Sequence, residues 1–143
     1  MRFDERLRGA EDRDFCIRLV RSTDVVCDPD PLSRVAKTGT RLSHQNMGPI
    51  YAYLLEKYRD DIAADRRVHA DWNYRAARAF VRAGQMPEAR EALRASVRIR
   101  PAHAQRWPLW LASFGGDRLM RAAFRAQVHG AELVQRARRR WRP

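Results

Sequence analysis

Hydrophobic residues recur at three- and four-residue steps along much of this chain, which is the spacing of one face of an α-helix. The first such stretch follows Gly9 and carries Phe15 and Leu19. A longer stripe begins at Asn46, and its apolar positions are Met47, Ile50, Tyr51, Leu54, Leu55, Tyr58 and Ile62. These patterns predict two amphipathic helices, and we expect the second to pack against the segment between them.

A helical hairpin is predicted at about residues 71–101. Gly84 lies at its turn, and Pro87 suits the first turn of the second helix. The spacing resembles one tetratricopeptide (TPR) repeat at Ala77, Phe80, Gly84, Ala89, Leu93, Ser96 and Pro101. Because a solenoid needs about three repeats to be stable, a single copy favours a hairpin packed on the preceding segment over a peptide-binding groove.

Two further helices are predicted after the hairpin. The first is short and aromatic, and its positions are Trp107, Trp110, Leu111 and Phe114. Helical spacing favours a buried face here over a stacking platform for nucleic-acid bases, which needs exposed rings. The last helix begins at Asp117, a good N-cap, and its inner face is predicted at Met120, Phe124, Val128, Ala131 and Val134.

Two short strands are predicted between the first two helices. Thr23–Cys27 is a β-branched run that ends at a turn, and Leu32–Ala36 forms the second candidate. The predicted fold class is therefore mainly α with a short β-hairpin. An edge strand without a partner exposes backbone hydrogen-bonding groups, so self-association or partial disorder before about Thr40 is expected.

The net charge of +12 is distributed unevenly over the 143 residues. Residues 1–60 carry only +1, whereas residues 61–143 carry +11. From Arg118 to the end there are eight basic residues and one acid. This asymmetry predicts an anionic neighbour, such as a membrane surface, a phosphate-bearing acceptor or nucleic acid. The basic last helix, with Trp141, suits an anionic lipid surface.

Acidic residues gather where the first helix begins. Glu11 and Asp12 fall in its first turn, where unpaired backbone N–H groups and the helix dipole favour ionised carboxylates. Such residues are common as helix caps. The pattern alone therefore leaves open both a cap and a catalytic carboxylate.

The order of residues within positions 3–18 resembles a known family. These residues read Phe-Asp-Glu, a short gap and then Gly-x-Glu-Asp-x-Asp-Phe-x-x-Arg. This order is similar to that of the acceptor-side segment of family 2 glycosyltransferases, which have the GT-A fold. The resemblance implies that Asp12 is the general base that takes the proton from the acceptor hydroxyl, with Glu11 beside it. Asp14 and Arg18 match further positions of the motif and are predicted substrate-binding residues that would orient this helix rather than react.

The resemblance extends to the segment that follows. In the family, a loop over the active site comes here, so Arg41 and His44 are implied to contact the donor diphosphate or its metal. The implied reaction is inverting transfer of a sugar from a nucleotide-sugar donor to an acceptor hydroxyl. A divalent metal, Mg²⁺ or Mn²⁺, is implied as cofactor, but the family's nucleotide-binding half and its Asp-x-Asp metal site precede this motif, so no ligands are expected in this chain.

These features predict two segments. Residues 1–64 would be the C-terminal remnant of a GT-A α/β domain, and residues 65–143 a helical, TPR-like extension. Asp28-Pro29-Asp30 follows the Glu-Asp pair and is interpreted as a turn. The chain alone is expected to be inactive, as a truncated sequence, a gene remnant or one part of a complex.

A small basic helical adaptor is the alternative. In it, Glu11 and Asp12 only cap a helix, and the hairpin or arginine surface binds a protein partner, RNA or an anionic membrane. Nucleic acid is disfavoured as a partner, because the aromatic residues have core spacing. The sequence has no apolar run of about eighteen residues and no apolar leader, and its two cysteines form no framework. A cytoplasmic location is predicted, with peripheral attachment at the inner membrane face as an option.

Overall fold

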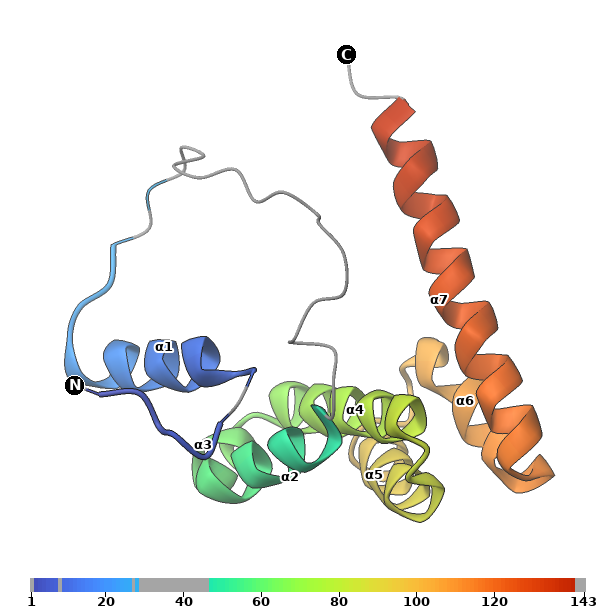
Figure 1. Ribbon diagram of the computed structural model, residues 1–143, viewed down its shortest axis with the longest axis horizontal. Coiled ribbons are helices and arrows are strands. Elements are labelled where there is room, and N and C mark those ends of the chain that lie inside the picture. Colours follow the sequence, from blue (N-terminus) through green and yellow to red (C-terminus); the bar gives the residue numbers. More distant parts are fainter. Residues whose placement is uncertain (1, 8, 27, 29–46, 141–143) are drawn as a thin grey trace.

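A computed structural model describes residues 2–7, 9–26, 28 and 47–140, and every regular element in these ranges is helical (Figure 1). The α-helices are α1 (Glu11–Ser22), α2 (Met47–Lys57), α3 (Arg59–Ala64), α4 (Arg66–Ala83), α5 (Met86–Ile99), α6 (Trp107–Ala112) and α7 (Asp117–Arg140). Two short 3₁₀ helices, η2 (Ala104–Arg106) and η3 (Ser113–Gly115), flank α6.

The predicted β-hairpin and the α/β GT-A fold class are wrong for the part of the chain that the structure describes. Residues 23–26 follow α1 and form no strand. Val25 is 50% exposed and Val26 94% exposed, so no neighbouring element covers the β-branched run. A strand is stabilised by its cross-strand neighbours rather than by intrinsic preference alone. The second predicted strand, residues 32–36, lies outside the described residues.

Helices α4 and α5 form a hairpin at the centre of the molecule. Asp65 caps α4 by accepting hydrogen bonds from the backbone N–H groups of Arg67 (2.6 Å) and Val68 (3.3 Å). Gly84 ends α4 in the left-handed conformation, with φ of 81°. The main core joins this hairpin to α6 and α7, and its buried residues are Tyr74, Ala76, Ala77, Phe80, Val81, Met86, Ala89, Ala92, Leu93, Leu109, Met120 and Phe124.

A smaller core joins the N-terminal segment and α1 to α2 and α3. Its buried residues are Leu7, Ala10, Leu54, Tyr58 and Ile62. The sequence predicts one helix over residues 46–62, but the structure interrupts it at Tyr58, between α2 and α3. Trp72 of α4 packs against this core. The segments predicted as residues 1–64 and 65–143 therefore lie in direct contact.

Helix α2 approaches α4 closely at Gly48. A Cβ atom at this glycine would lie 2.5 Å from Cδ1 of Phe80, far inside normal contact distance. The missing side chain therefore lets the two helices pack at their present separation.

The predicted inner faces of the last two helices are only partly buried. Phe114 is 64% exposed and Leu111 is 58% exposed, so the aromatic stretch does not form the fully buried face that its spacing predicts. Leu109 takes the core position instead. Helix α7 begins at Asp117 as expected and then extends away from the other helices (Figure 1), which leaves Ala131 exposed. Within the described ranges, no helix is long and apolar enough to span a membrane.

Candidate functional site

Glu11 stabilises the start of α1. Its Oε2 atom accepts a hydrogen bond of 2.6 Å from the backbone N–H of Gly9, whose φ of 105° turns the chain into the helix. Hydrogen bonds from backbone N–H groups, chiefly its own and that of Gly9, lower the pKa of Glu11. Of the two predicted catalytic carboxylates, Glu11 is thus the one bonded to the turn that precedes α1.

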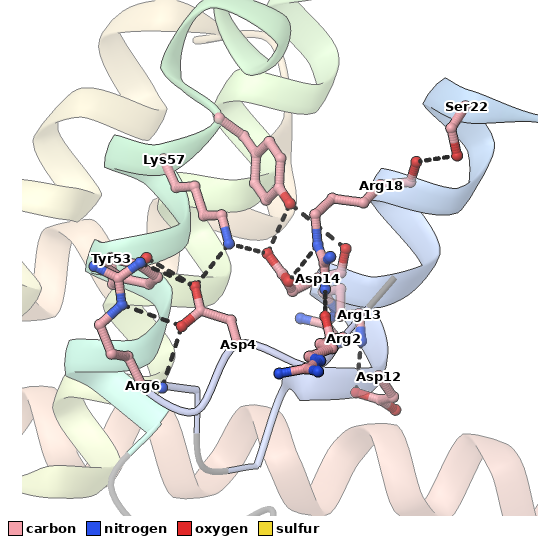
Figure 2. Close-up of polar contacts among 11 residues, drawn as sticks. Arg2, Asp4, Arg6, Asp12, Arg13, Asp14, Arg18, Ser22, Tyr53 and Lys57 are labelled. Carbon is pink, nitrogen blue, oxygen red and sulfur yellow. Dashed lines mark hydrogen bonds and ion pairs between the residues drawn. The ribbon is translucent and has the colours of Figure 1, made fainter.

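Asp12 is exposed and has few protein partners. Its carboxylate accepts a hydrogen bond of 2.7 Å from the backbone N–H of Arg13, and it forms no ion pair with any described residue. Figure 2 shows Asp12 directed away from the side chains that gather around Asp14. The carboxylate of Asp12 is therefore accessible to a molecule from solution.

Asp14 lies two residues further along α1 and is completely buried (0% exposed). It accepts hydrogen bonds from Lys57 Nζ (2.6 Å), Tyr58 Oη (2.7 Å) and Arg18 Nε (2.8 Å) (Figure 2). Burial raises the pKa of this carboxyl, but the hydrogen bonds from Lys57, Tyr58 and Arg18 outweigh it and hold the pKa below its usual value. Asp14 thus fastens α1 to α2 in its ionised form.

Lys57 also joins Asp14 to Asp4 in the N-terminal segment. Asp4 accepts hydrogen bonds from Lys57 Nζ (2.8 Å), Tyr53 Oη (2.9 Å) and Arg6 Nε (3.1 Å). The Arg6 and Lys57 hydrogen bonds hold the pKa of Asp4 far below its usual range. Burial opposes the charge of Lys57, yet its bonds to Asp14 and Asp4 raise its pKa. We call Asp4, Asp14, Arg18, Lys57 and Tyr58 the Asp14 cluster.

A cavity of about 400 Å³ opens on the other side of α1, between the start of α1, the start of α2 and the middle of α4. It is lined by Gly9, Ala10, Asp12, Arg13, Met47, Tyr51, Arg75, Arg78, Ala79 and Arg82. We call it the arginine cavity, because its lining carries four arginines and a single carboxylate.

Aromatic rings lie beside three of these arginines, and the Arg82 guanidinium is 5.5 Å from the ring centroid of Phe124. Arg13 donates a hydrogen bond of 2.7 Å to Tyr51 Oη, and its guanidinium lies 5.3 Å from the ring centroid of Tyr51 and 5.9 Å from that of Trp72. The Arg78 guanidinium lies 5.9 Å from the ring centroid of Tyr74 and 5.6 Å from that of Phe124. These contacts position the positive charges without neutralising them.

Arg78 has an unsatisfied donor. Its Nε atom is buried and finds no hydrogen-bond acceptor within the described residues. Arg75 and Arg82 lie on the same face of α4, because positions three and seven apart fall on one side of a helix, and both are exposed. None of these three arginines forms an ion pair with a carboxylate in the described ranges.

The structure separates the residues that the sequence analysis grouped together. Asp12 lines the arginine cavity, whereas Asp14 and Arg18 belong to the buried Asp14 cluster. Arg41 and His44 lie outside the described residues. The arginines of α4 are not among the residues predicted from the sequence, although the spacing of Arg75, Arg78 and Arg82 indicates one cationic helix face.

The arrangement does not fit the divalent metal that the resemblance implies. In the described part of the chain, no three His, Cys, Asp or Glu side chains lie close enough to hold a metal ion. The arginine cavity offers one carboxylate among four guanidinium groups, which would repel a cation. We therefore derive no chemical step through a metal.

The described residues form an all-helical fold with a cationic cavity beside an exposed carboxylate. Comparison of the chain with protein-family models, with curated proteins and with solved structures finds no match.

Proposed function

We propose that this chain supplies the acceptor side of a glycosyltransferase related to family 2, in which Asp12 is the general base. The observation that carries the proposal is the contrast among the three carboxylates of the motif. Glu11 accepts a hydrogen bond from the turn at Gly9, and Asp14 is buried in an ion-paired cluster. Only Asp12 presents an unpaired carboxylate to a cavity.

The proposed reaction is an inverting displacement at the anomeric carbon of the donor sugar. The acceptor oxygen forms a bond to this carbon while the bond from the carbon to the donor phosphate oxygen breaks. The diphosphate leaves with the electron pair of that bond, and Asp12 takes the proton of the acceptor hydroxyl. A base positioned in this way contributes about 10²- to 10⁴-fold to the rate.

The local structure supports this role for Asp12. It lies in the first turn of α1, where the helix dipole favours a negative charge. The Asp14 cluster holds the other face of this helix, so the position of Asp12 is fixed by buried contacts rather than by its own bonds. The proposal assigns no α/β domain to the described residues. In the resembled family, the donor-binding half precedes the motif.

A sugar-transfer assay on the full-length natural protein tests the proposal. The purified protein is offered UDP-, GDP- and dTDP-linked sugars with a cell extract as acceptor source, and transfer of radiolabel is measured. Asp12→Asn is expected to lower the transfer rate at least 100-fold, whereas Arg94→Gln, an exposed change on α5, leaves it unchanged. Transfer that survives Asp12→Asn overturns the proposal, as does the absence of transfer from every donor.

A basic helical adaptor is the second candidate, and the observation that favours it is the row of exposed arginines on α7. Arg118, Arg121 and Arg125 all face solvent on a helix that extends away from the other helices (Figure 1). An adaptor would transfer no sugar from any donor. The same assay therefore separates the two candidates.

A further inference from the structure

The arginine cavity has the properties of an anion-binding site. Its lining carries an excess of three positive charges, and its volume of about 400 Å³ falls in the usual range for small-molecule sites. The buried Nε of Arg78 lacks an acceptor among the described residues. Buried donors in native proteins are nearly always paired, so this atom is available to a ligand that supplies an acceptor.

Phosphate is the anion that best matches this lining. A guanidinium presents its N–H groups as a planar fork that fits phosphate oxygens. Arg75, Arg78 and Arg82 present three such forks from one face of α4. Because aromatic rings already hold Arg78, less side-chain freedom is lost when a ligand binds.

The position of Asp12 in the same cavity indicates which substrate carries the phosphate. In an inverting displacement, the leaving group departs from the face of the sugar opposite the attacking oxygen. The base must contact the attacking hydroxyl, so the cavity that contains the base lies on the acceptor side. A phosphate held in this cavity therefore belongs to the acceptor rather than to the departing nucleoside diphosphate.

We infer that the arginine cavity binds an acceptor that carries a phosphate group, with Arg75, Arg78 and Arg82 holding the phosphate and Asp12 facing the hydroxyl that receives the sugar. This inference rests on the proposed function. It adds the class of acceptor, a phosphorylated alcohol, and three positioning residues on α4. The volume of the cavity leaves room for a polyol or sugar unit beside the phosphate.

The test is calorimetric binding to the full chain. The probes are sn-glycerol 3-phosphate, glycerol as its neutral match, UDP as the leaving-group match, and a short oligouridylate. Glycerol 3-phosphate is expected to bind, and glycerol is not. Each of Arg75→Gln and Arg82→Gln raises the Kd for glycerol 3-phosphate about tenfold, as expected for loss of one charge-assisted contact. Both side chains are exposed, and circular dichroism checks that Arg82→Gln, which also loses a contact with the Phe124 ring, keeps the fold.

A control variant makes the result specific. Arg94→Gln removes an exposed arginine of α5 outside the cavity, and its Kd for glycerol 3-phosphate equals that of the wild type. A loss of affinity in Arg94→Gln equal to that in Arg75→Gln overturns the inference, because the effect then reflects net charge alone.

Other ligands give distinct results. UDP that binds more tightly than glycerol 3-phosphate, with the same loss in Arg75→Gln and Arg82→Gln, overturns the assignment to the acceptor. Tighter binding of the oligouridylate overturns it in favour of a nucleic-acid surface.

The two proposals fail separately. Phosphate binding without any effect of Asp12→Asn on sugar transfer refutes the role of the base. Transfer that depends on Asp12, without binding of glycerol 3-phosphate, refutes only the present inference.

Discussion

The Asp14 cluster and the arginine cavity lie on opposite sides of α1 and differ in how their charged side chains are paired. In the cluster, each carboxylate accepts hydrogen bonds from cations and tyrosines, and the buried Asp14 has three such partners. In the cavity, four arginines face one carboxylate, and the buried Nε of Arg78 has no partner among the described residues. Satisfied charges hold a structure together, whereas unsatisfied ones are available to a ligand.

Breaking the Asp14 cluster is expected to cause the largest change in the free energy of unfolding. Asp14→Ala leaves Lys57 and Arg18 beside a buried space without their carboxylate, and loss of one partner of a buried pair costs about 3 kcal/mol of the free energy of unfolding. Urea unfolding followed by circular dichroism measures it. Asp12→Ala is the matched control two residues away, and it costs only about 0.5 kcal/mol, because it loses little more than the interaction with the helix dipole. Equal costs for the two variants would contradict the comparison.

The pH dependence of stability sharpens the same contrast. The pKa values of Asp14 and Asp4 are lower in the folded chain than in the unfolded chain. Their contribution is therefore complete above the unfolded value of about 3.9 and is lost as the pH falls through the folded values. Removing one such carboxyl by Asp14→Asn reduces the slope of stability against pH by up to about 1.4 kcal/mol per pH unit below pH 4.

Urea unfolding between pH 2 and pH 6 measures these slopes. Arg94→Gln, an exposed change that removes no carboxyl, serves as the control and keeps the slope of the wild type. A slope that Asp14→Asn leaves unchanged would show that Asp14 does not couple folding to protonation.

The smallest change in the free energy of unfolding is expected in the cavity, and it is a stabilisation rather than a loss. Arg78→Met keeps the length of the side chain but removes the buried Nε that lacks an acceptor, together with one of several like charges on α4. The lost contacts with Tyr74 and Phe124 offset part of this gain. We expect stabilisation of up to about 1 kcal/mol, measured as a rise in the midpoint of urea unfolding. Destabilisation by more than 1 kcal/mol would mean that Arg78 is a structural residue.

Local patterns were sufficient to predict most of the helices. The turn at Gly84 and the start of α7 at Asp117 follow from backbone freedom and capping, which depend on a few neighbouring residues. The strand predicted at Thr23–Cys27 failed because strand formation depends on a partner that the local sequence does not reveal. The same limit applies to α6, where the core position belongs to Leu109 rather than to Phe114.

The site depends on contacts between distant parts of the chain, and these were not predictable. Asp14 and Lys57 are 43 residues apart, so nothing local indicated that one acid of the motif would be buried and ion-paired. Asp12 and Arg78 line one cavity although 66 positions separate them. The sequence was sufficient to predict Asp12 as a candidate base. Its neighbours on α4 could not be predicted, because they come close to it only through the packing of α1, α2 and α4.

Gly48 affects the contacts on both sides of α1. Its missing side chain sets the separation of α2 from Phe80 of α4. Helix α2 carries Tyr51, which holds Arg13, and Lys57, which holds Asp14. A methyl group at position 48 would force α2 outward and displace both of these anchors together. A residue without any functional group thus sets the position of the helix on which both of these anchors depend.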